Sequence, residues 1–179
     1  MLRRVGLIEA SQYAVFGAVE AFLALYCTDK GIAPWLIGWI LGIQLVGIIL
    51  LKPLFGRLSD RVGRVPLIRA GLLTAATGVA AIPALSGVFS LTAASVVFGL
   101  GFAAVTSSTA ALAADAARAS SMGSTIGALR TLMDIGQTAG PVIAGFLIGS
   151  YGYGAGFGAL AALLAFAAMV AWRLESVVA

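Results

Sequence analysis

The sequence predicts an all-α membrane protein that crosses the bilayer six times. Apolar residues make up 61% of its 179 positions and charged residues only 10%, and the mean hydropathy is +1.06. A soluble domain carries about 25% charged residues. The apolar residues gather in six runs of the length that a membrane-spanning helix needs, about 20 residues. The basic residues lie almost entirely at one set of ends of these runs.

The first predicted helix covers residues 5–27. A basic pair precedes it, as in a secretory signal peptide. However, Glu9, Gln12 and Glu20 interrupt the apolar stretch, and the core of a signal peptide is apolar throughout. We therefore expect this segment to remain as a helix of the mature protein.

The other five predicted helices follow after short loops, so each should pack antiparallel to the next. They cover residues 34–55, 67–86, 89–114, 122–148 and 154–172. No run between them is long enough for a soluble domain. We expect one six-helix domain over residues 1–179.

Small residues recur within the predicted helices at the spacing that lets two helix backbones approach closely in lipid. The GxxxG pairs are Gly38 and Gly42, Gly123 and Gly127, and Gly136 and Gly140. The spacing fits both a static packing interface and one along which helices slide.

The distribution of positive charge predicts the orientation of the helices, because cytoplasmic loops are enriched in Lys and Arg. The basic residues at one set of ends are Arg3, Arg4, Lys52, Arg57, Arg61, Arg64, Arg69, Arg118 and Arg173. Only Lys30 lies at the other set, and Arg130 falls inside a span. Both termini should therefore be cytoplasmic. The net charge of +4 is explained by topology and requires no nucleic acid as a partner.

Several classes of enzyme are excluded by what the sequence lacks. There is no His, and Cys27 is the sole cysteine, so a His/Cys metal site, a disulfide framework and a Ser-His-Asp triad are impossible. The stretch 99–104 fits G-x-G-x-x-[GA], but that pattern indicates a dinucleotide site only between a strand and a helix. We expect no enzyme activity, no metal and no cofactor.

The segment between the second and third predicted helices is Gly-Arg-Leu-Ser-Asp-Arg-Val-Gly-Arg, residues 56–64. Gly56 and Gly63 would allow a tight reversal of the chain. Asp60 can accept hydrogen bonds or pair with an arginine, and Arg61 and Arg64 can hold acidic groups or helix C-termini at the membrane rim.

This segment resembles the loop signature of the major facilitator superfamily, G-x-L-[SA]-D-R-x-G-R-[RK], with Val65 replacing the last basic residue. In that family the loop controls alternating access between inward-open and outward-open states. The resemblance implies a conformational gating loop made of Gly56, Asp60, Arg61, Gly63 and Arg64, in which Asp60 and Arg61 form the latch.

The fifth predicted helix contains a second element similar to one of that family, G-x-x-x-G-P-x-x-G-G. Its residues here are Gly136, Gly140, Pro141 and Gly145, with Ala144 in place of a glycine. A proline inside a helix removes one hydrogen bond and favours a bend. The element is typical of antiporters, and the resemblance implies export, although similar elements occur in the second halves of other transporters.

The chain has half of the roughly twelve helices of that family, and resembles the C-terminal half more than the N-terminal half. Pro53 and Pro141 form a weak internal echo, which agrees with a 3+3 inverted repeat. We expect a second six-helix half to complete the transporter, supplied by a missing segment, another chain or a second copy.

Ionisable and polar side chains inside the spans are the candidates for binding, since a charge at mid-membrane costs at least about 2.5–3.5 kcal/mol. In the first helix, Glu20 shares a stripe with Glu9, Gln12 and Tyr13, and could bind a proton or a cationic solute. It could also pair locally or reach the outer interface. Gln44 of the second helix could contribute a hydrogen bond to the solute.

Arg130 and Asp134 are the corresponding candidates in the fifth helix. Their i, i+4 spacing allows a pair within the helix that only lowers the cost of insertion. The same residues could instead act in gating or binding, and both readings remain open.

The sequence as a whole predicts one half of a secondary active transporter in the bacterial plasma membrane. It would move a small solute by alternating access, coupled to an ion and favouring export. The alternative is a membrane protein derived from a transporter that no longer transports and has a structural or regulatory role.

Overall fold

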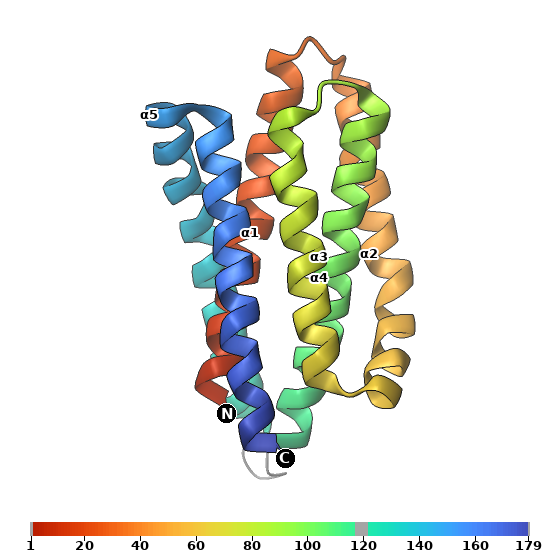
Figure 1. Cartoon of the computed structure of the whole chain (residues 1–179), viewed down its shortest axis with the longest axis vertical. Helices are drawn as coiled ribbons and strands as arrows, with labels where there is room; N and C mark the ends of the chain where they lie inside the picture. The colour runs from red at the N-terminus through yellow and green to blue at the C-terminus, as the bar shows by residue number, and fades with distance from the viewer. Residues whose placement is uncertain (1, 117–121, 179) are drawn as a thin grey trace.

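The computed structural model describes residues 2–116 and 122–178, and its secondary structure there is helical throughout. The elements are α1 (Leu2–Asp29), α2 (Pro34–Val62), α3 (Arg64–Ala81), the short 3₁₀ helix η1 (Ile82–Ala84), α4 (Val88–Ala116) and α5 (Met122–Val178). Within these ranges, five helices are long and apolar enough to cross a membrane. The long helices run side by side as an upright bundle (Figure 1).

The two last predicted spans, 122–148 and 154–172, fall within the single 57-residue helix α5. Its backbone is non-helical at Gly152, where φ is 82° and ψ is 171°. Figure 1 shows the α5 ribbon reversing direction at the top of the view, so that α5 consists of two antiparallel arms. We call them the first arm (122–151) and the second arm (153–178).

The segment 56–64 is a helix end rather than the predicted loop. α2 continues through Gly56, Asp60 and Arg61 to Val62, and the chain reverses at Gly63 alone, with φ 98°. Only a residue without a side chain adopts this conformation readily. The prediction failed at Gly56 because polar residues mark where the apolar run stops, whereas a helix can continue beyond it.

Helix packing depends on glycines that bring backbones together. In α5, a Cβ atom at Gly136 or Gly140 would overlap the carbonyl oxygens of Ala10 and Ala14 in α1. In lipid, such close approach replaces the hydrophobic effect as the source of helix association. The same glycines were predicted to bend the helix, together with Pro141 and Gly145. Pro141 lies within helix, the backbone there is helical, and Gly145 packs against Phe22.

The other two GxxxG pairs form no close helix contact among the residues that the structure describes. Cβ atoms at Gly38 and Gly42 of α2, or at Gly123 and Gly127 of α5, would meet open space. Of the three predicted pairs, only Gly136 and Gly140 form an interface between described helices.

Aromatic rings fill the space between α1 and α4. Phe16 stacks on Phe102 with ring centroids 4.4 Å apart, and Tyr13 meets the edge of Phe102 at 5.3 Å. Phe98 extends the cluster along α4. Phe102 also contacts two polar side chains described below, Tyr13 and Lys52.

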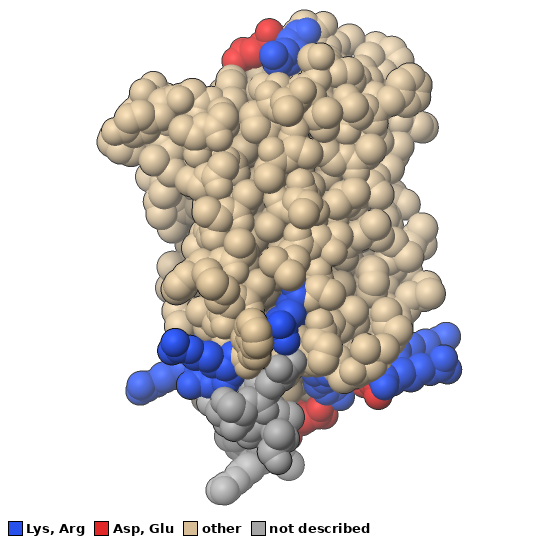
Figure 2. Space-filling view, viewed as in Figure 1, with Lys and Arg blue, Asp and Glu red and all other residues tan. Residues whose placement is uncertain are grey.

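The basic side chains gather at the end of the bundle where both termini lie (Figures 1 and 2). We call this end the basic rim and define it by the arginines near the helix ends there, Arg3, Arg4, Arg57, Arg61, Arg64, Arg69 and Arg173. Arg118, which was predicted to belong to it, lies outside the described residues. Lys30 and Asp29 mark the opposite end. The surface between the two ends is almost entirely uncharged in this view, as the hydrocarbon core of a bilayer requires.

Candidate functional site

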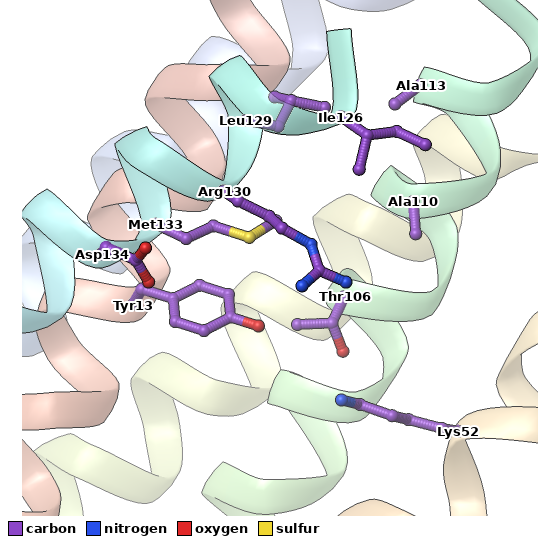
Figure 3. A pocket seen from close by; sticks show the side chains of 10 residues that line it. All are labelled: Tyr13, Lys52, Thr106, Ala110, Ala113, Ile126, Leu129, Arg130, Met133 and Asp134. Atoms are coloured by element: carbon purple, nitrogen blue, oxygen red, sulfur yellow. The ribbon is translucent and has the colours of Figure 1, made fainter. Parts of the chain in front are cut away.

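A cavity of about 500 Å³ opens between α1, α2, α4 and the first arm of α5 (Figure 3). Each of the four elements contributes side chains to its wall. The lining residues are Tyr13, Lys52, Thr106, Ala110, Ala113, Ile126, Leu129, Arg130, Met133 and Asp134. The volume is that of a pocket for a small molecule.

Two of the four polar residues predicted for binding, Arg130 and Asp134, line this cavity. They do not form the predicted i, i+4 ion pair, and neither has an ion-pair partner in the described part of the chain. In Figure 3 the Arg130 guanidinium points toward Thr106 and Lys52, while the Asp134 carboxylate lies beside Tyr13. The two charges therefore face different parts of the cavity.

Lys52 is the cavity residue that the sequence analysis misplaced, since it was counted among the charges of the basic rim. It is half-buried, and its ammonium group lies 6.0 Å from the centroid of the Phe102 ring. The signal was present in the sequence, because Lys52 comes one helical turn before the charged segment begins. It therefore lies deeper than the rim arginines.

A second group of polar side chains is buried behind the cavity wall, between α1 and α4. Glu9 is 1% exposed and accepts a hydrogen bond from the Thr109 hydroxyl, while its Oε2 has no partner. Gln12 donates from Nε2 to the Phe102 carbonyl at 3.2 Å, and its Oε1 has no partner. Buried polar atoms without partners are rare in folded proteins, so these two acceptors mark a site that a proton or another donor can occupy.

Glu20 and Gln44, the other two predicted binding residues, do not line the cavity. The Glu20 side chain is exposed on α1. Gln44 is buried where α2 packs on Gly99 of α4, with its Oε1 unpartnered. The stripe on α1 thus divides: Glu9 and Gln12 face α4, whereas Glu20 does not.

Arg64 connects three helices at the basic rim. From the start of α3 it forms an ion pair with Asp60 near the end of α2 at 3.3 Å, and another with Asp115 near the end of α4 at 2.6 Å. Asp115 is therefore paired with an arginine of the charged segment. Arg61, predicted to share the latch with Asp60, is exposed and has no ion-pair partner among the described residues.

The opposite end of the bundle is fastened by tyrosines. Tyr153, just after the break in α5, donates a hydrogen bond to Asp29 at 2.6 Å. Tyr26 donates to the carbonyl oxygens of Pro83 and Leu85, and its ring packs against Tyr153 with centroids 5.0 Å apart. These contacts join α1, η1 and α5 at the end away from the basic rim.

The comparison with known protein families decides what this bundle is. The sequence profile described as the Major Facilitator Superfamily matches residues 5–178. The chain belongs to the Major Facilitator Superfamily. The resemblance of its charged segment, residues 56–64, to the signature of that superfamily is thus confirmed. Membership makes it an integral membrane protein and points to a transporter rather than an enzyme.

A solved transporter structure shares the fold. The crystal structure of the human organic anion transporter MFSD10 (TETRAN) matches with a TM-score of 0.87 at 19% sequence identity. The match covers 95% of this chain but only 40% of that transporter, so the chain spans less than half of its length. No curated protein sequence matches the chain significantly.

Proposed function

We propose that the chain is one half of a secondary active transporter that moves a small solute across the membrane by alternating access. The observation that carries this proposal is the cavity, because its polar lining comes from four helices that could tilt relative to one another. A carrier needs a binding site within the membrane that becomes accessible from each side in turn. In this proposal α5 supplies the fifth and sixth spans, and the six spans form a 3+3 inverted repeat.

The second half of the transporter would cover the cavity. Large apolar side chains on both flanks are exposed: on α2 they include Leu45, Val46, Ile49, Leu50 and Leu54, and on the first arm of α5 they include Ile135, Val142, Ile143 and Phe146. These flanks fit a second six-helix half contributed by a missing segment, another chain or a second copy. The remaining exposed surface would face lipid.

The basic rim would lie in the cytoplasm, with both termini, and the host membrane would be a bacterial plasma membrane. This orientation follows from the excess of Arg and Lys at that end. Arg64, through Asp60 and Asp115, would hold the ends of α2, α3 and α4 together in one state. Breaking these pairs would let the helices separate in the other state.

Protons are the proposed coupling ions, and export is the proposed direction. Glu9 is the carboxyl group best placed for coupling, since it is buried beside the cavity and has one unpartnered oxygen. Glu20 and Asp134 remain the candidates that the sequence predicts. The Gly-Pro element around Pro141 supports export through its similarity to antiporters.

The test measures proton flux in membrane vesicles when a solute is added. The vesicles come from cells that express the gene together with its natural neighbouring genes, so that any second half is also present. A pH-sensitive dye reports flux as small aromatic acids, amines and amides are added one at a time. The proposal predicts flux with at least one solute. It also predicts a loss of at least tenfold in Glu9→Gln, with Asp29→Asn at the opposite end as the matched control.

Two results separate the parts of the proposal. If none of the solutes in the panel changes the proton flux, the proposal of transport is contradicted. Full flux in Glu9→Gln together with loss in Glu20→Gln or Asp134→Asn would move the coupling site to those residues.

A further inference from the structure

We propose that the cavity recognises an organic anion, and that Lys52 and Arg130 hold its acidic group between them. This inference rests on the proposed function and adds the chemical class of the solute. It is argued from the charges, hydroxyl groups and apolar side chains of the cavity wall.

The two cations converge on one part of the cavity from different helices. In Figure 3 the Lys52 ammonium on α2 and the Arg130 guanidinium on α5 point toward the same space, beside Thr106 of α4. Asp134, the only carboxylate among the described residues of the cavity wall, lies at the other end against Tyr13. The space between Lys52 and Arg130 is therefore positive.

Neither cation forms an ion pair in the described part of the chain, although Lys52 is near enough to the buried Glu9 carboxyl to interact with it electrostatically. The ion pairs recorded there belong to Arg64, and neither Lys52 nor Arg130 has a carboxylate within ion-pair distance. Two like charges that face one cavity within a membrane are unfavourable unless an anion joins them. A carboxylate or sulfonate can accept two parallel hydrogen bonds from the guanidinium and a third from the ammonium.

One hydroxyl group, that of Tyr13, fits the same ligand. Tyr13 has no hydrogen-bond partner among the described residues, and in Figure 3 its oxygen points into the space between Asp134 and Thr106. Its proton is thus free for an acceptor on the solute. The Thr106 hydroxyl already donates to the Phe102 carbonyl at 2.9 Å, so it can only accept within the cavity.

The rest of the wall suits an apolar body. Ile126, Leu129 and Met133 of α5 and Ala110 and Ala113 of α4 line the cavity above the two cations. An apolar wall with a few converging polar groups is the usual form of a small-molecule site. A flat aromatic ring carrying one acidic group matches both parts of the cavity.

Binding to the purified chain tests the inference without requiring transport. The probes are three molecules of similar shape and different charge: 1-naphthoate, 1-naphthamide and 1-naphthylmethylammonium. Calorimetry in an uncharged detergent measures each dissociation constant. We expect 1-naphthoate to bind at least tenfold more tightly than the other two, and less tightly as salt is added.

Single substitutions then identify the cations responsible. Lys52→Gln and Arg130→Gln should each weaken 1-naphthoate binding at least tenfold and change 1-naphthamide binding less than twofold. Lys30→Gln and Arg57→Gln remove the same charges outside the cavity and should leave 1-naphthoate binding unchanged. Thermal unfolding of each variant shows that it is folded.

Tighter binding of the ammonium or the amide would overturn the inference, as would unchanged naphthoate binding in folded Lys52→Gln and Arg130→Gln. The proposed function would fail differently, through the lack of solute-dependent flux in vesicles. A chain that binds 1-naphthoate through both cations without such flux would support this site and contradict transport.

Discussion

At the scale of single residues, Arg64 is the side chain on which the basic rim depends. Its guanidinium reaches carboxylates at the ends of two other helices, and its side chain is 22% exposed while those of Asp60 and Asp115 are 64% and 59% exposed. Because the carboxylates are largely in solvent, each pair contributes little to folding stability. The pairs should instead affect the equilibrium between the two states of the transporter, in which the ends of α2, α3 and α4 lie together or apart.

Replacing Arg64 with Gln should therefore lower the free energy of unfolding by only about 1 kcal/mol or less. The difference from the wild type should shrink further at high salt, which screens exposed charges. Thermal unfolding in detergent at two salt concentrations measures this. Arg57→Gln is the control, since Arg57 has no ion-pair partner in the described residues, and an equal loss of stability in that variant would contradict the assignment.

The residue scale is also where sequence reasoning succeeded least. Of the stripe on α1, Glu9 and Gln12 are buried and Tyr13 lines the cavity, whereas Glu20 is exposed. Helical spacing gives the angular position of a side chain, and not how closely neighbouring helices pack at that level. The same limit explains why Lys52 was assigned to the basic rim, since the sequence does not show the cavity that its side chain lines.

At the scale of helices, the observed helix ends differ from the ends of the predicted spans. α2 extends seven residues beyond the predicted end at Phe55, to Val62. α3 stops at Ala81, before the predicted end at Ser86, and is followed by η1, which contains Pro83. Hydropathy reports where the hydrocarbon boundary lies, whereas capping glycines and prolines determine where the helix stops.

The contact between α1 and α5 gives a prediction at this scale. Gly140→Ala places a methyl group against the Ala14 carbonyl, so the two helices must separate, and overpacking of this kind costs about 1–3 kcal/mol. Gly127→Ala, on the same helix with open space around it, should be neutral or stabilising, since Ala is the better helix former. Thermal unfolding of the two variants measures the difference, and equal melting temperatures would contradict the packing.

The reversal in α5 gives a second prediction. Gly152 has φ 82° and ψ 171°, a conformation that costs residues with a side chain about 1–3 kcal/mol. Gly152→Ala should lower the melting temperature, whereas Gly158→Ala in the helical second arm should not. A rise in melting temperature for Gly152→Ala would show that the two arms form one continuous helix.

At the scale of the whole molecule, the sequence predicted the helical class because hydrocarbon imposes long apolar runs that a single sequence displays. It predicted the superfamily through the charged segment at residues 56–64. The segregation of basic residues to one end was equally visible. Consecutive helices were expected to pack on one another, but α1 packs mainly on α5 and α2 mainly on α4, because pairing depends on which small-residue faces meet. Two of the three GxxxG pairs point away from the described bundle.

The outward-facing pair on α2 gives a prediction for assembly. Gly38 and Gly42 lie in an apolar groove with Trp39, Val46 and Leu50, on one of the flanks assigned to the second half. Gly42→Leu should leave the melting temperature of the isolated chain unchanged, because nothing within the chain occupies that space. It should reduce chemical crosslinking to the second half in native membranes. Undiminished crosslinking would place that face toward lipid.

The central claim is that the cavity opens to each side of the membrane in turn, and labelling of one cysteine tests it most directly. Cys27, the sole cysteine, is buried and is replaced by alanine, and Ala110→Cys places a thiol in the cavity wall. A membrane-impermeant maleimide is applied to right-side-out and to inside-out vesicles, with Lys30→Cys and Arg57→Cys reporting the two ends. The account predicts that the thiol at position 110 reacts from both sides, while position 30 reacts only from outside and position 57 only from inside. Reaction at position 110 from a single side would contradict alternating access.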